Sequence, residues 1–124
     1  MRAFIALIFL CLMCGNVVAN SVQDSATPAD AIIKAEYDYL RAAYLCRDVV
    51  GADRYLRARS IVKAIELGFM EKEDIAETLV KKMENEIQIS LKYHSKNISA
   101  EECDTLLKAG THQLYLAMDS LFKL

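Results

Sequence analysis

The chain has 124 residues, of which 54% are hydrophobic and 26% are charged, so its composition is that of a globular domain. Its 17 acidic side chains outnumber the 15 Lys and Arg for a net charge of -2, and the absence of a basic block argues against nucleic-acid binding. One Pro and four Gly supply few of the turns that an all-β fold needs. A mostly helical protein is therefore predicted.

The N-terminus has the pattern of a secretory signal peptide. Arg2 precedes an uncharged apolar run from Ala3 to Met13, and small residues lead to the expected cleavage after Ala19. The run is shorter than the roughly 20 residues of a membrane-spanning helix. Cleavage would remove Arg2 and no acidic residue, which leaves a net charge of -3. We expect a signal peptide over 1–19, a flexible leader over 20–27 and a periplasmic helical domain over 28–124.

The cysteines fall into two groups. Cys11 and Cys14 lie in the signal peptide, and each follows a large residue where a lipoprotein signal has a small one, so a lipid anchor is the less favoured alternative. Cys46 and Cys103 remain in the exported chain and are predicted to form one disulfide. A metal site or a redox pair is the alternative, but there is no CxxC and no His at ligand spacing.

The first helix is predicted from Pro28 to about Val50. Thr27 supplies an N-cap hydroxyl, Pro28 takes the first helical position, and Asp30 places an acid in the first turn. Gly51 ends the pattern. The expected buried stripe consists of Ile33, Tyr37, Leu40 and Tyr44.

The second helix is expected to begin at Asp53 as its cap and to end at Gly68. A glycine followed by Phe69 suits a left-handed C-cap with a hydrophobic contact. The expected buried positions are Leu56, Ile61, Val62 and Ile65.

The third helix is expected from Glu71 to about Tyr93, since Glu71, Glu73 and Asp74 place negative charge in its first turn. Its expected stripe is Ile75, Leu79, Met83, Ile87 and Leu91.

The fourth helix has the clearest start. Ser99 and Glu102 form a capping box, while Ile98 and Cys103 occupy the positions of a hydrophobic staple. Gly110 marks either a kink or a close helix crossing. The stripe continues through Leu106, Leu107, Leu114, Met118, Leu121 and Phe122.

These elements predict an all-α, up-down-up-down four-helix bundle with one disulfide. Short connections at Gly51, at Gly68 to Met70 and at His94 to Ser99 require antiparallel neighbours. Cys46, near the end of the first helix, and Cys103, near the start of the fourth, then lie at the same end of the bundle.

No motif for catalysis, nucleotide binding or haem attachment occurs, so we expect neither an enzyme nor a cofactor. His94 and His112 are interpreted as surface or cap-adjacent residues, because the Glu-x-x-His pairs of a bundle metal site are absent. Glu101 and Glu102 point in different directions on a helix and are interpreted as structural.

Arginines and tyrosines concentrate in the first two helices, and both residue types dominate protein interfaces. A solvated face with Tyr in the core is the simpler interpretation. The residues are Arg41, Arg47, Arg54, Arg57 and Arg59, interleaved with Tyr37, Tyr39, Tyr44 and Tyr55.

Four features follow one another between residues 37 and 122: a helix that carries Cys46, a helix that ends near Gly68, the stretch Lys92-Tyr93-His94-Ser95-Lys96, and a last helix that carries Cys103. In this order they resemble the Tai family of immunity proteins. It implies a small periplasmic helical protein, as a homodimer, that neutralises a peptidoglycan amidase toxin of a type VI secretion system with a projecting segment. Asn97 and Ile98 stand where the family pattern has a Gly-containing turn, so the loop shape is expected to differ.

We therefore expect a protein that binds and inhibits a protein partner, with Tyr93, His94 and Lys96 as partner-binding residues and no metal, nucleic acid or membrane as ligand. An exposed connection that is tied down by a disulfide and a capping box costs little ordering entropy on binding. The alternatives are a periplasmic acid-stress chaperone, for which two His make a weak pH trigger, and a structural protein of the envelope.

Overall fold

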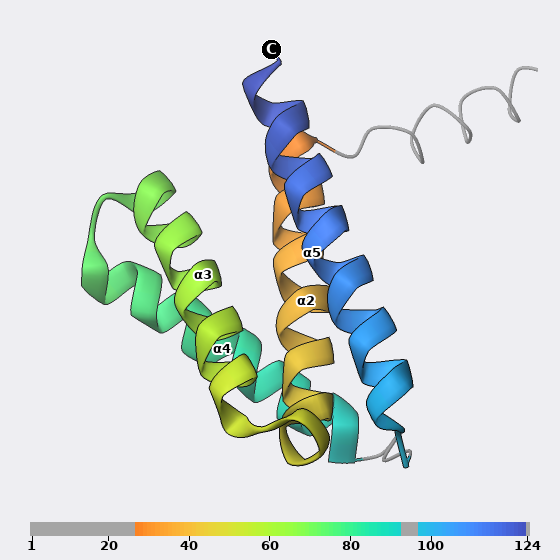
Figure 1. The fold of residues 1–124 in the computed structure, drawn as a ribbon. Coiled ribbons are helices and arrows are strands. Elements are labelled where there is room, and N and C mark those ends of the chain that lie inside the picture. The colour runs from red at the N-terminus through yellow and green to blue at the C-terminus, as the bar shows by residue number, and fades with distance from the viewer. Residues whose placement is uncertain (1–26, 93–96, 124) are drawn as a thin grey trace, which may run out of the picture.

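The computed structural model describes residues 27–92 and 97–123. This part of the chain holds four helices: α2 (Pro28–Val50), α3 (Ala52–Met70), α4 (Glu73–Lys92) and α5 (Ala100–Phe122) (Figure 1). The protein is all-α, as predicted. The expected signal peptide and nearly all of the expected leader lie outside the described residues. No helix in the described ranges combines the length and apolar composition that crossing a membrane requires.

Two helices begin where their capping residues predict. The Thr27 hydroxyl accepts from the backbone N–H of Asp30, whose carboxylate accepts in return from the backbone N–H of Thr27. Ser99 and Glu102 form the same reciprocal pair at the start of α5. Both capping boxes satisfy N–H groups that a helix leaves unpaired at its start.

The predicted boundaries of the middle helices were wrong by a few residues. Gly51, at φ 100°, is the N-cap of α3, so Asp53 lies in the first turn instead of capping it. Gly68 stays inside α3, and the left-handed C-cap is Glu71, at φ 58°, whose N–H donates to the Leu67 carbonyl. The third helix consequently begins at Glu73, two residues after the predicted start.

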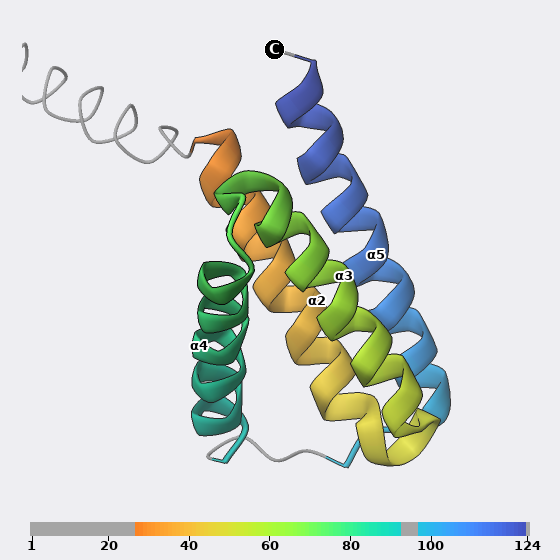
Figure 2. The ribbon, with the colours of Figure 1, turned by 90° about the vertical axis from the view of Figure 1, so that its left-hand side faces the viewer.

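The helices alternate in direction, with α2 at the centre. α2 packs against α5, α3 and α4, and α3 also packs against α4. In the described helices, no Cα atom of α5 lies within 8 Å of one in α3 or α4. Figure 2 shows α4 on the opposite side of α2 and α3 from α5. The up-down arrangement is thus open: α3 and α5 both begin at the same end of α2, where Arg54 and Asp104 form an ion pair, and they diverge from there instead of closing over α2 (Figure 1).

The disulfide and a close helix crossing hold α5 to α2. Cys46 and Cys103 are bonded and completely buried at one end of the two helices, as predicted. A Cβ atom at Gly110 would lie 3.3 Å from the Cα of Tyr39, so this glycine marks a close crossing, one of its two expected roles.

The buried face differs in part from the predicted stripes. In α2, Ile32 and Tyr39 are buried while Ile33 is exposed, because three helices pack on α2 and shift the centre of its buried face. In α3, Ala58 is fully buried and Leu56 is exposed, since a small side chain permits close packing. Four further residues of the predicted stripes are exposed, namely Ile61, Ile75, Leu106 and Phe122.

Candidate functional site

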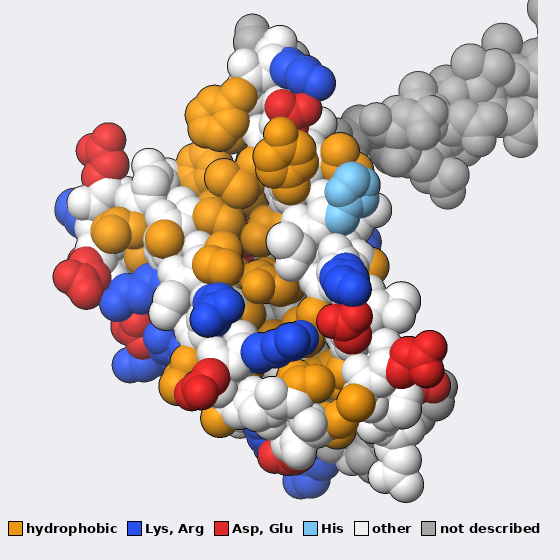
Figure 3. All heavy atoms as spheres, viewed as in Figure 1, with side chains coloured by type: hydrophobic (Ala, Val, Ile, Leu, Met, Phe, Trp, Pro, Cys, Tyr) orange, Lys and Arg blue, Asp and Glu red, His pale blue; other side chains and the backbone are white. Residues whose placement is uncertain are grey.

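A groove runs between α3 and α5 over the surface of α2. Two adjoining hollows of about 600 Å³ and 580 Å³ form it, and both are bordered by Thr111 and Tyr115. We call the whole depression the α3–α5 groove. Figure 3 shows hydrophobic side chains gathered along its length between the two helices, with Lys and Arg below them.

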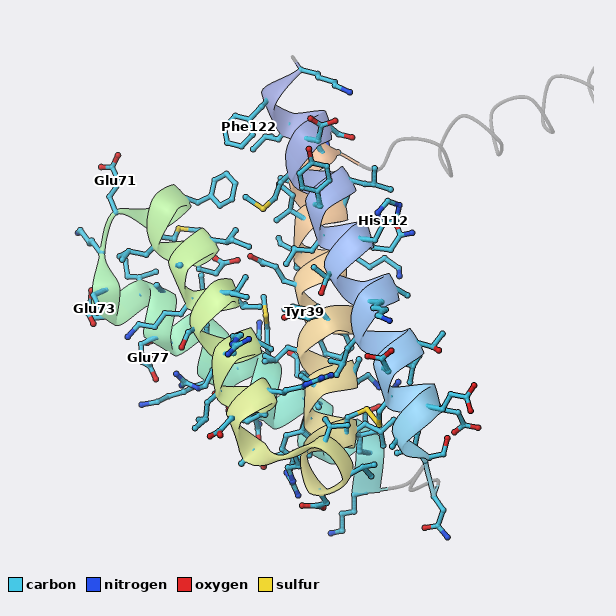
Figure 4. All side chains as sticks on the ribbon, in the orientation of Figure 1. Tyr39, Glu71, Glu73, Glu77, His112 and Phe122 are labelled. Carbon is cyan, nitrogen blue, oxygen red and sulfur yellow. A yellow bond between two sulfur atoms is a disulfide. The ribbon has the colours of Figure 1, made fainter. Side chains whose placement is uncertain are left out.

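The half of the groove near the ends of α3 and α5 is apolar. Its main lining residues are Ile61, Ile65 and Phe69 from α3 and Leu114, Met118 and Phe122 from α5. Phe69 is 48% exposed and Phe122 is 80% exposed. Figure 4 shows Phe122 on the side of α5 that faces α3. Such a concentration of exposed apolar side chains is typical of a surface that binds another molecule.

The other half of the groove is cationic. Arg54 and Arg57 from α3 and Lys108 from α5 border it, and Tyr39 lines it from α2. Asp104 is the one carboxylate in this lining; its Oδ atoms lie 2.8 Å from Lys108 Nζ and 3.8 Å from Arg54. Both cations, Lys108 first, lower the pKa of Asp104. One negative charge against three positive ones leaves this half with a positive surplus.

Acidic residues at the end of α3 and in α4 lie outside the groove. Figure 4 shows Glu71, Glu73 and Glu77 on the side of α3 and α4 away from α5. The same view shows the His112 ring turned away from α3, at the outer border of the cationic half. His112 is exposed, consistent with the prediction that it is a surface residue.

A polar network between α3 and α4 is the densest cluster of charges. Arg59 donates to Glu77 at 2.5 Å and to Glu84 at 2.8 Å, and the Tyr55 hydroxyl also donates to Glu84. Lys63 Nζ lies 3.2 Å from Glu77. Arg59 first, then Lys63, lower the pKa of Glu77 to about 2. Because the charged groups are paired with one another, we interpret the network as a structural contact that holds α3 against α4.

Two buried carboxyl groups lie side by side between α2 and α3. Glu36 is completely buried and Glu66 is 5% exposed, and neither oxygen of Glu36 has a hydrogen-bond partner among the described residues. Burial, and secondarily the neighbouring Glu66, raise the pKa of Glu36 to about 9. The Glu36 carboxyl is therefore protonated at neutral pH.

The predicted partner-binding residues Tyr93, His94 and Lys96 lie outside the described residues, so their role stays a prediction. The arginine and tyrosine residues divide between two settings. Arg54 and Arg57 reach the groove beside Tyr39, whereas Arg47 lies over the ring of Tyr44, 3.8 Å from its centroid. Exposed Arg54 and Arg57 beside buried Tyr39 agree with a solvated face that has Tyr in the core, and the interface interpretation stays a prediction.

The apolar groove was not foreseen as a site, because its residues had been assigned to the core. The sequence does hold a signal for it, because α3 and α5 carry more large apolar side chains than they can bury against α2. The exposed ones are Ile61, Phe69, Tyr115 and Phe122.

The described residues bring together no group of three or more His, Cys, Asp or Glu that could hold a metal ion. The chain matches no family model, no curated protein and no solved structure. The α3–α5 groove is thus the candidate site on geometric grounds.

Proposed function

We propose that this protein acts by binding and inhibiting another protein in an oxidising compartment, and that it turns over no substrate. The observation that carries the proposal is the apolar half of the α3–α5 groove, which leaves Phe69 and Phe122 open to solvent. Fully burying an exposed Phe side chain contributes about 1.5–3 kcal/mol, so covering the exposed parts of Phe69 and Phe122 contributes roughly 2–4 kcal/mol in total. That is a substantial contribution to the free energy of a specific complex.

The partner class follows from the resemblance to Tai immunity proteins, which favours a peptidoglycan amidase toxin of a type VI secretion system. The buried Cys46–Cys103 disulfide supports export to the periplasm, where such toxins act. The connection that contains Tyr93, His94 and Lys96 remains a second proposed contact.

Titration of an amidase effector tests the proposal. The oxidised chain, added to a peptidoglycan amidase effector of a type VI secretion system, is expected to abolish hydrolysis of purified peptidoglycan at about one equivalent, since a tight one-to-one inhibitor acts stoichiometrically and preorganisation lowers the cost of binding. Phe69→Ser should weaken inhibition, while Ile89→Ser, a matched change at an exposed apolar residue on α4, should not. Unchanged inhibition by Phe69→Ser would refute the groove as the binding surface. Binding of many unrelated unfolded proteins only at acid pH would favour a chaperone.

A further inference from the structure

We propose that the groove holds a single amphipathic helix of the partner, apolar over most of its length and acidic at the end that covers Arg54, Arg57 and Lys108. This inference rests on the proposed function, because it specifies which structural element of the partner the groove binds.

The arrangement of helices leaves room for one more. α2 packs against both α3 and α5, while in the described structure no Cα atom of α3 lies within 8 Å of one in α5, and the Arg54–Asp104 ion pair joins these two helices near their starts. In a closed four-helix bundle, a fourth helix covers such a pair from the other side. α4 does not take that position, because it lies on the opposite side of α2 and α3 from α5 (Figure 2). A helix from outside would complete the bundle between α3 and α5.

The groove has the dimensions and chemistry of a helix site. Arg54 and Phe69 border its two ends along α3, and fifteen residues of helix rise about 22 Å, or roughly four turns. A helix about 10 Å wide carries a broad stripe of side chains, which suits a groove whose apolar walls come from two helices and whose end is cationic. Apolar side chains at i, i+3, i+4 and i+7 would form the contacting stripe.

The charges determine which end of that helix is acidic. Asp104 is shared by Arg54 and Lys108, while Arg57 makes no ion pair with any described residue. Arg57 is exposed on the border of the groove, so a carboxylate from outside can reach it. Complementary charge at one end also sets the direction in which the guest helix lies.

The test uses two labelled peptides of about 16 residues, with Leu along one stripe and either three Glu or three Lys in the last turn of that stripe. Fluorescence anisotropy with the oxidised chain is expected to give at least about tenfold tighter binding of the Glu peptide. Arg57→Glu leaves two cations and two carboxylates in this half of the groove and should abolish the preference. Lys82→Glu, the same change at an exposed lysine of α4, should leave it intact.

Apolar variants complete the test. Phe69→Ser should weaken binding of both peptides by at least about fivefold, and Ile89→Ser should not. Equal affinity for the two peptides, or no effect of Phe69→Ser, would overturn the inference. Displacement of the bound peptide by a free fatty acid would also overturn it. The same holds if sedimentation shows that the chain forms a dimer and that Phe69→Ser dissociates this dimer.

The two proposals fail separately. If Phe69→Ser abolishes inhibition of the amidase but neither peptide binds, the groove binds its partner through something other than a helix. If peptides bind but Phe69→Ser leaves inhibition unchanged, the proposed function fails while the groove remains a helix site.

Discussion

Substitution of the buried carboxyl by its neutral isostere, Glu36→Gln, should stabilise the protein at neutral and alkaline pH. Glu36 is fully buried beside Glu66 and its pKa is raised from 4.5 to about 9. The folded state therefore binds one proton more than the unfolded state between these two pH values. This stability contribution is complete below about pH 4.5, decreases as the pH rises, and is lost above about pH 9.

The magnitude follows from the width of that interval. Each pH unit changes the free energy of unfolding by about 1.4 kcal/mol, so ionisation of Glu36 in the unfolded chain costs on the order of 3 kcal/mol between pH 4.5 and 7. Gln keeps the shape of the side chain and cannot ionise. Glu36→Gln should thus match the wild type near pH 4 and exceed it by on the order of 3 kcal/mol at pH 7.

Urea unfolding followed by far-ultraviolet circular dichroism between pH 4 and pH 9 measures this difference. Taking the difference between variant and wild type cancels the titrating groups that do not interact with Glu36, such as the ion pairs of Glu77 and Asp104, and leaves the titration of Glu36 together with its neighbour Glu66. Glu86→Gln, at an exposed position of α4, is the control and should differ from wild type by less than about 0.5 kcal/mol throughout. A difference for Glu36→Gln that does not change with pH would refute the reasoning.

Three further changes test the packing, all by urea unfolding of purified protein. Replacing both Cys46 and Cys103 by Ser should cost about 2–4 kcal/mol, because the unfolded chain regains the entropy of a long loop; an unchanged midpoint would contradict this. Gly110→Leu should cost about 1–3 kcal/mol by forcing α5 off α2, whereas Gly68→Ala, with open space around it, should gain up to about 1 kcal/mol. Arg59→Met should cost about 2 kcal/mol, a value between those typical of losing an exposed and a buried ion pair. Full retention of stability would mean that the ion pairs between α3 and α4 do not stabilise the fold.

The starts of α2 and α5 were predictable because their signals are local: Thr27 and Ser99 cap these helices through hydrogen bonds to residues only three positions away. The cross-link was predictable because the two cysteines outside the expected signal peptide permit one pairing. The left-handed cap was misplaced for the opposite reason. Gly68 tolerates that conformation best, but the helix continues past it and Glu71 adopts it instead.

The burial of particular side chains could not be predicted, because it depends on which helices pack together. A stripe such as Ile61 to Phe69 identifies an apolar face without indicating whether this chain covers it. Here α4 packs against the other side of α3 and leaves that stripe open. Glu36 and Glu66 illustrate the same limit, since no periodicity rule places two carboxyl groups in a core.

Hydrogen exchange of the chain, free and in complex with the proposed amidase partner, tests the central claim most directly, because it locates the surface that binding covers. Slower exchange is expected at residues 61–69 of α3 and 114–122 of α5, with α4 unchanged. Protection confined to α4, or to the connection over 93–96, would show that the partner binds elsewhere and would contradict the assignment of the α3–α5 groove.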